Sequence, residues 1–127
     1  GLLREAFAKT DGKLSANTNI DLEDGMVHYF TTQETTTSTP NIRYNSSKSL
    51  NNMMNINDAI TVTIITVAAA AGYSAQVTID GGSISEQWVG GSAPSAGGDD
   101  GRDIYTYNII KTADATFLVI VNVVNAT

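Results

Sequence analysis

The sequence contains no cysteine and only one histidine among its 127 residues, which restricts the chemistry that it can support. Without cysteine the chain can form neither a disulfide framework nor a thiolate metal site. A Ser-His-Asp triad would have to use His28, and no nucleophile-elbow motif accompanies it. We therefore expect a protein that is not an enzyme, in which His28 is packed or hydrogen-bonded within a strand.

Basic residues are also scarce, because seven Lys and Arg stand against thirteen Asp and Glu and give a net charge of -6. Nucleic acid would require a basic surface, so we expect no nucleic-acid partner. The same charge argues against an anionic membrane surface. The apolar run at 117–124 is too short to span a bilayer. Residues 1–13 lack the basic and apolar regions of a signal peptide, and we expect none there.

The residues that are abundant are Val, Ile, Thr and Tyr, gathered in short segments that glycine turns separate. These residue types favour strands, and turn signals about every ten residues are typical of an all-β sandwich or barrel. We predict an antiparallel β-sandwich, jelly-roll-like, over residues 20–127, with residues 1–19 as an N-terminal arm or lead-in. No internal repeat of fixed period is visible. The predicted strands are 26–32, 41–44, 59–67, 73–80, 83–89, 103–111 and 116–124.

Two segments of the predicted domain are unusual. Residues 116–124 carry apolar side chains on both faces around Asn122, which predicts a strand buried on both sides, inside the sandwich or between subunits. Residues 90–101, GGSAPSAGGDDG, form a long loop with five glycines. Fixing such a backbone is entropically costly, so we expect this loop to lie outside the sheet core and to be either mobile or held by a partner.

Two acidic clusters supply oxygen atoms of the kind that calcium prefers. Neither cluster has the ligand spacing of an EF-hand loop, so we expect solvated acidic turns, with no metal and no cofactor. The first cluster consists of Asp99, Asp100 and Asp103, and the second of Asp21, Glu23 and Asp24.

Three aromatic residues, Trp88, Tyr105 and Tyr107, are the candidate binding residues, since aromatic faces stack on the apolar surfaces of sugars. The alternative is that they pack in the core or at an interface. Glu86 and Asp103 could form the paired carboxylates of a glycoside hydrolase, but the sequence does not give their separation.

Three long runs are distinctive in combination: TTQETTTSTPNIRYN at 31–45, DAITVTIITVAAAAGYSAQVTIDG at 58–81, and WVGGSAPSAGG at 88–98. Together they resemble a module of virion structural proteins from tailed phages that infect marine cyanobacteria, often found near the end of fibre-like or appendage-like chains. The resemblance extends over about residues 1–124. It brings no catalytic or binding residue to a position of this sequence.

The resemblance implies a structural, non-enzymatic virion protein, such as a fibre, appendage or capsid-decoration subunit. Its partners would be copies of itself and other virion proteins. The absence of cysteine is compatible with assembly in the reducing host cytoplasm before residence in the virion. The alternative is a receptor- or carbohydrate-binding module on the virion surface, whose partner would be a host-surface glycan.

Overall fold

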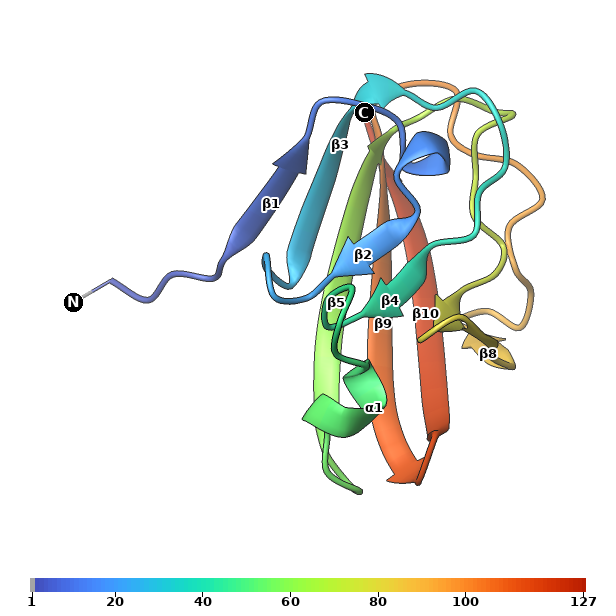
Figure 1. The fold of residues 1–127 in the computed structure, drawn as a ribbon. Helices are drawn as coiled ribbons and strands as arrows, with labels where there is room; N and C mark the ends of the chain where they lie inside the picture. The colour runs from blue at the N-terminus through green and yellow to red at the C-terminus, as the bar shows by residue number, and fades with distance from the viewer. Residues whose placement is uncertain (1) are drawn as a thin grey trace.

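The computed structural model describes residues 2–127 and consists mostly of β-structure in two mixed sheets, as the all-β prediction required (Figure 1). Two short helices connect strands, the 3-10 helix η1 (Leu14–Ala16) and α1 (Leu50–Met53). The six-stranded sheet contains, in spatial order, β1 (Phe7–Thr10), β3 (Val27–Gln33), β5 (Ala59–Val67), β9 (Arg102–Ala113), β10 (Thr116–Ala126) and β8 (Glu86–Trp88). The four-stranded sheet contains β2 (Asn19–Asp21), β4 (Asn41–Arg43), β6 (Thr78–Ile79) and β7 (Gly82–Ser83).

The first six strands alternate between the two sheets, so that the chain winds through three turns of a coil. Strands β1, β3 and β5 run parallel in one sheet, and β2, β4 and β6 run parallel in the other. The prediction of an antiparallel, jelly-roll-like arrangement is therefore wrong for this half of the chain. The strands are parallel because each connection crosses to the opposite sheet and does not fold back as a hairpin.

The repeat of this coil escapes the sequence because its length changes. Asn19 and Asn41 are hydrogen-bonded neighbours 22 residues apart, whereas Asn41 and Thr78 are hydrogen-bonded neighbours 37 residues apart. The additional residues lie mainly between β4 and β5, where they form α1 and its flanking turns. A search for a fixed period therefore finds none.

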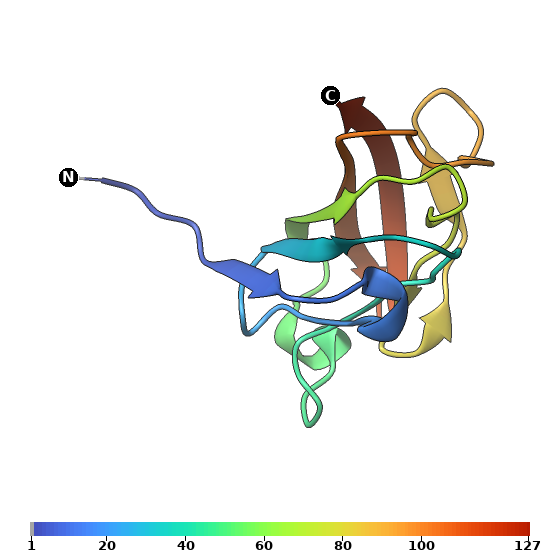
Figure 2. The same ribbon diagram turned by 90° about the horizontal axis from the view of Figure 1, so that it is seen from above.

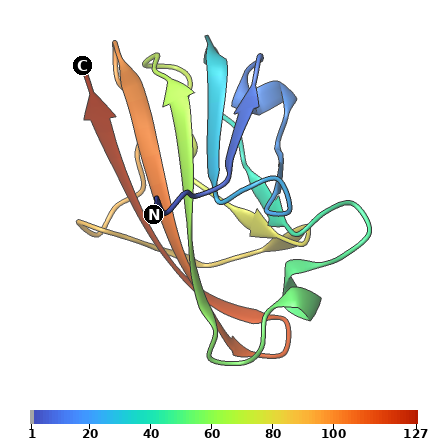
Figure 3. The ribbon, with the colours of Figure 1, turned by 90° about the vertical axis from the view of Figure 1, so that its left-hand side faces the viewer.

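In the second half of the six-stranded sheet, β5, β9 and β10 pair antiparallel, whereas β8 pairs parallel with β10 at the edge. Strand β9 pairs with β5 on one side and with β10 on the other (Figure 3). The predicted strand at 59–67 is confirmed with identical bounds, and those at 103–111 and 116–124 lie inside β9 and β10. Only the short strands β6, β7 and β8 form around 73–80 and 83–89. Between residues 73 and 77, side chains accept hydrogen bonds from two backbone N–H groups that a longer strand would use. Tyr105 Oη accepts from the Ser74 amide at 3.0 Å, and Glu86 Oε1 accepts from the Val77 amide at 2.6 Å.

The N-terminal boundary differs from the prediction. Residues 7–10 form β1, Leu14 is 1% exposed in the core, and residues 19–21 form β2, so 7–19 belong to the folded body and not to an arm. Residues 2–6 precede β1 outside any strand and lead away from the body (Figure 2). Leu2 and Leu3 in this segment are 75% and 99% exposed.

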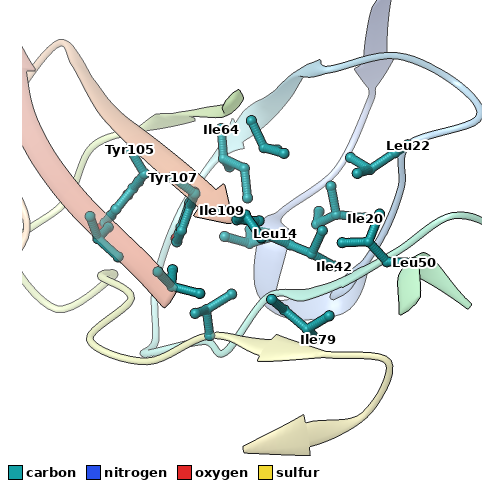
Figure 4. Packing of buried hydrophobic residues seen from close by; sticks show 14 of the residues in the cluster. Leu14, Ile20, Leu22, Ile42, Leu50, Ile64, Ile79, Tyr105, Tyr107 and Ile109 are labelled. Carbon is teal, nitrogen blue, oxygen red and sulfur yellow. The ribbon is translucent and has the colours of Figure 1, made fainter. Parts of the chain in front are cut away.

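Side chains from both sheets meet in one hydrophobic core (Figure 4). Ile20, Ile42 and Ile79 lie in register on neighbouring strands of the four-stranded sheet and are 0%, 0% and 3% exposed. Burying each such side chain contributes about 1.5–3 kcal/mol. The six-stranded sheet faces them with fully buried residues that include Val62, Ile64, Tyr107, Ile109, Val119 and Val121.

The other face of the six-stranded sheet points away from this core, and we call it the outer face. On β10, Val119 and Val121 are 0% exposed, but Ile120 on the outer face is only partly buried and Val124 is 50% exposed. Burial of β10 on both faces is therefore wrong for the single chain. Both faces of β10 carry apolar side chains, but the four-stranded sheet packs against only one of them.

The loop at 90–101 is held in part by its own chain. The Gly97 amide donates to Ala70 O at 2.9 Å, the Gly98 amide donates to Asp103 Oδ2 at 3.0 Å, and Asn125 Nδ2 donates to Asp100 O at 2.8 Å. Gly90 and Gly91, by contrast, have no neighbouring atom that an added Cβ would touch. The expectation of a loop that is either mobile or held by a partner does not include these bonds within the chain, which hold its second half.

Substitution of neighbouring residues on β10 tests which face is buried. We expect Val121→Asp to lower the free energy of unfolding by at least about 3 kcal/mol, because an unpaired carboxylate would enter the core. Ile120→Asp, on the outer face of the same strand, should cost roughly 1 kcal/mol. Chemical denaturation measures both, and equal losses would contradict the assignment of the two faces.

A glycine substitution tests the packing of the loop. A Cβ on Gly97 would collide with the backbone carbonyl of Ala69 and lie 3.0 Å from Asp103 Oδ2. We therefore expect Gly97→Ala to destabilise the fold by about 1–3 kcal/mol through overpacking. The control is Ser95→Ala, an exposed position in the same loop. A melting temperature of Gly97→Ala equal to that of the control would show that the loop does not pack as described.

Candidate functional site

The predicted aromatic platform does not form, because two of its three residues lie in the core. Tyr105 and Tyr107 project from the inward face of β9 and are each 1% exposed, with ring centroids 6.4 Å apart. Burial raises the pKa of Tyr105 to about 12 and raises that of Tyr107 as well. Trp88 lies opposite Val121 and packs partly buried against the core. Neither tyrosine ring is open to a sugar, so the packing alternative holds.

The carboxylates of Glu86 and Asp103 do not form a hydrolytic pair. Glu86 lies beside Val119 of β10 and Asp103 beside Asn125 of the same strand. Six positions along a strand correspond to roughly 20 Å, whereas paired glycosidase carboxylates lie about 5–10 Å apart. Each also accepts a hydrogen bond from a separate backbone amide.

The acidic cluster before β3 is engaged in bonds within the coil. Asp21 Oδ1 accepts from Arg43 Nε at 2.6 Å, and Glu23 Oε2 accepts from Asn45 Nδ2 at 3.3 Å. His28 is 4% exposed, and its Nε2 lies 2.8 Å from Gly25 O, as the packed or hydrogen-bonded interpretation predicted. Burial lowers the pKa of His28, against the opposing effects of the Gly25 carbonyl and Asp24. Within residues 2–127, no three His, Asp or Glu side chains are arranged to hold a metal ion.

Glu34 is a buried carboxylate that sequence reasoning missed. It is 2% exposed, and its oxygens accept hydrogen bonds from the Leu14 amide at 2.8 Å and the Ser15 amide at 3.4 Å. Burial raises the pKa of Glu34, although these two bonds oppose the shift. The residue joins η1 in the first turn of the coil to the end of β3 in the second. Its position in a polar, threonine-rich run gave no sign of burial.

A polar groove of about 330 Å³ lies beside β4 and the turn that follows it. Its amides are already used within the chain. Asn41 bonds to Asn19, Thr78 and the Gly81 amide, and Asn45 accepts from two backbone amides. No aromatic ring lines the groove. It therefore lacks both the stacking surface and the free amides of a typical sugar site.

The outer face of the six-stranded sheet is not covered by the second sheet. Its residues line up across strands, and one row runs from Tyr29 through Ile65 and Ile104 to Val124. A neighbouring row consists of Val27, Thr63, Thr106 and Asn122. The apolar outward residues of β3, β5, β9 and β10 are Val27, Tyr29, Ile65, Val67, Ile104, Ile110, Leu118, Ile120 and Val124.

Charge is nearly absent from this face. The strands present Lys9 and Arg102 on it and no acidic side chain, although the whole chain carries a net charge of -6. Arg102 Nε donates to Tyr29 Oη at 3.0 Å, and its guanidinium lies 5.8 Å from the Tyr29 ring centroid. The ring centroids of Phe7 and Tyr29 lie 6.4 Å apart, so the contacts extend from Arg102 through Tyr29 to Phe7 on β1. The surface suits contact with another protein better than it suits a small molecule.

None of the helices in residues 2–127 has the length and apolar character needed to cross a membrane. Comparisons of the chain found no matching family model, no matching curated protein and no matching solved structure.

Proposed function

We propose that this chain is a non-enzymatic structural subunit of a tailed-phage virion, in a fibre, an appendage or a capsid decoration, and that it assembles with copies of itself through its β-sheets. The runs at 31–45, 58–81 and 88–98 resemble virion structural proteins of tailed phages, and this resemblance supports a role in the virion. The two sheets packed on one core would then act as a β-sandwich module that is repeated in the particle.

The observation that carries the assembly role is the outer face. Its partly exposed isoleucines and valines gain about 25 cal/mol for each Å² of apolar surface removed from water. Two chains with a net charge of -6 repel each other over most of their surfaces. This repulsion is smallest where the outer faces meet, because no outward strand residue there is acidic.

The buried polar groups support a structural role. Glu34 holds η1, and Asp103 holds the loop at 90–101. Lys111 is 7% exposed, and its Nζ donates to Asn51 O at 2.7 Å and Met54 O at 3.0 Å, which anchors α1 to β9. Each of these groups is committed to the fold, and none faces a cavity with a second reactive group beside it.

The assembly part is tested by sedimentation of purified protein. We expect the wild type to form oligomers and Ile120→Asp to reduce them strongly, because the carboxylate would enter the apolar contact. Thr36→Asp adds the same charge at an exposed connection outside the sheets and serves as the control. Wild type that stays monomeric at millimolar concentration would contradict self-assembly.

The virion part is tested separately by mass spectrometry and immunogold labelling of purified particles that encode the chain. Regularly spaced label on a fibre, appendage or capsid is expected. Absence of the chain from purified particles would refute the virion role. Reproducible hits of the isolated chain on a glycan array would favour the receptor-binding alternative.

A further inference from the structure

Strand β1 ends the six-stranded sheet and has a neighbour, β3, on one side only. Residues 2–6 continue β1 toward the N-terminus, outside any strand, and are exposed. Within residues 2–127, no backbone pairs with the far edge of this segment. Such an edge presents unpaired N–H and C=O groups that can bind another strand.

The backbone orientation of this edge follows from contacts on its inner side. A Cβ on Gly25 would lie 2.5 Å from Ala6 O, so the Ala6 carbonyl points toward its own body. The Gly12 carbonyl likewise points inward and accepts from the Thr32 amide at 3.2 Å. Because successive residues of a strand direct their N–H and C=O groups to opposite edges, those of Phe7 and Lys9 point to the free edge.

The side chains along this edge have a self-complementary order. Phe7 and Lys9 share one face of β1, since side chains alternate along a strand. If residues 3–6 extend this strand when a second copy pairs with it, Leu3 and Glu5 join the same face. We infer that the edge formed by residues 2–10 pairs antiparallel with the same edge of a second copy, around a two-fold axis beside Phe7. The inference rests on the proposed self-assembly and adds a contact between two copies at the sheet edge, distinct from the contact between outer faces.

Charge selects this register. A two-fold axis perpendicular to the sheet keeps each side chain on its face, so the residue at the axis lies opposite itself. With Phe7 at the axis, Glu5 lies opposite Lys9 of the second copy, and the same pair occurs twice. An axis at Glu5 would place two glutamates opposite each other. An axis at Ala8 would place Glu5 opposite Asp11.

The surroundings of Phe7 fit the same arrangement. Phe7 is 54% exposed and lies 6.4 Å from the Tyr29 ring, which Arg102 covers. Two Phe7 rings at the axis would contact each other and join the Tyr29 and Phe7 rings of one copy to those of the second copy. Residues 2–6 lead away from the body at the start of β1 (Figure 2). The outer faces of the two copies would then form one continuous surface.

A cysteine at the axis tests the pairing directly. The natural chain has no cysteine, so Phe7→Cys introduces a unique thiol. Opposite residues in a hydrogen-bonded antiparallel pair have Cα atoms about 5.5 Å apart, within disulfide range. Mild oxidation should convert most of Phe7→Cys to a covalent dimer, whereas the exposed control Thr36→Cys should form no covalent dimer.

Charge reversal tests the register without a disulfide. Glu5→Lys and Lys9→Glu should each raise the dimer dissociation constant roughly tenfold or more, because two attractions become two repulsions. The double variant E5K/K9E restores both pairs and should recover the wild-type constant. Lys9 also lies 3.5 Å from Asp11 in its own chain, but Glu5 has no such contact, so recovery by the double variant isolates the intermolecular pair. Lys48→Glu, an exposed lysine far from β1, is the control.

The outcomes separate this inference from the proposed function. Oligomers of the wild type with no Phe7→Cys cross-link, or with no effect of the charge reversals, would overturn the β1 pairing and leave self-assembly standing. Single reversals that weaken the dimer without recovery in the double variant would overturn the register. A wild type that is monomeric throughout would overturn the pairing together with the self-assembly, while particle composition would still decide the virion role.

Discussion

The structure depends on the in-register contact between Ile20, Ile42 and Ile79, three isoleucines that the coil places on adjacent strands. The strands that carry them have only two or three residues each, too few for their backbone bonds to hold a sheet together. Burial of these side chains against β5, β9 and β10 supplies the stability that the short ladders lack. Polar pairs beside them, such as Asp21 with Arg43, fix the register at the surface.

The strands whose composition alternates cleanly could be predicted from sequence, and those whose hydrogen bonds go elsewhere could not. The bounds of β5 follow from its Ile and Val content, and the hairpin of β9 and β10 follows from the turn between two long apolar runs. The segment at 73–77 alternates equally well. The Ser74 amide donates to Tyr105 Oη, 31 residues away, and the Val77 amide donates to Glu86 Oε1 across the following turn, so the alternation of the segment does not reveal these partners.

The candidate sites were harder to predict because a residue type does not state which side of a sheet it occupies. Tyr105 and Tyr107 alternate with Ile104 and Thr106 on β9, and either set could have faced the core. The tyrosines face inward because the four-stranded sheet lies on that side. The four-stranded sheet lies there because the chain winds as a parallel coil. The sequence did not reveal this coil, because the length of its repeat changes. The outer face therefore received isoleucines that composition alone would have assigned to the interior.

The distribution of charge connects the fold to assembly. Most acidic residues lie in turns and connections, and Glu34, Glu86 and Asp103 accept hydrogen bonds from backbone amides. On the outer face of the six-stranded sheet, the strand residues provide only Lys9 and Arg102 as charges. At physiological ionic strength, charges interact over about 8 Å. Two copies that approach through their turns therefore repel, whereas copies that approach through the outer face or the edge of β1 meet little opposing charge. The same acidity that keeps the single chain soluble thus restricts the orientations in which two chains can associate.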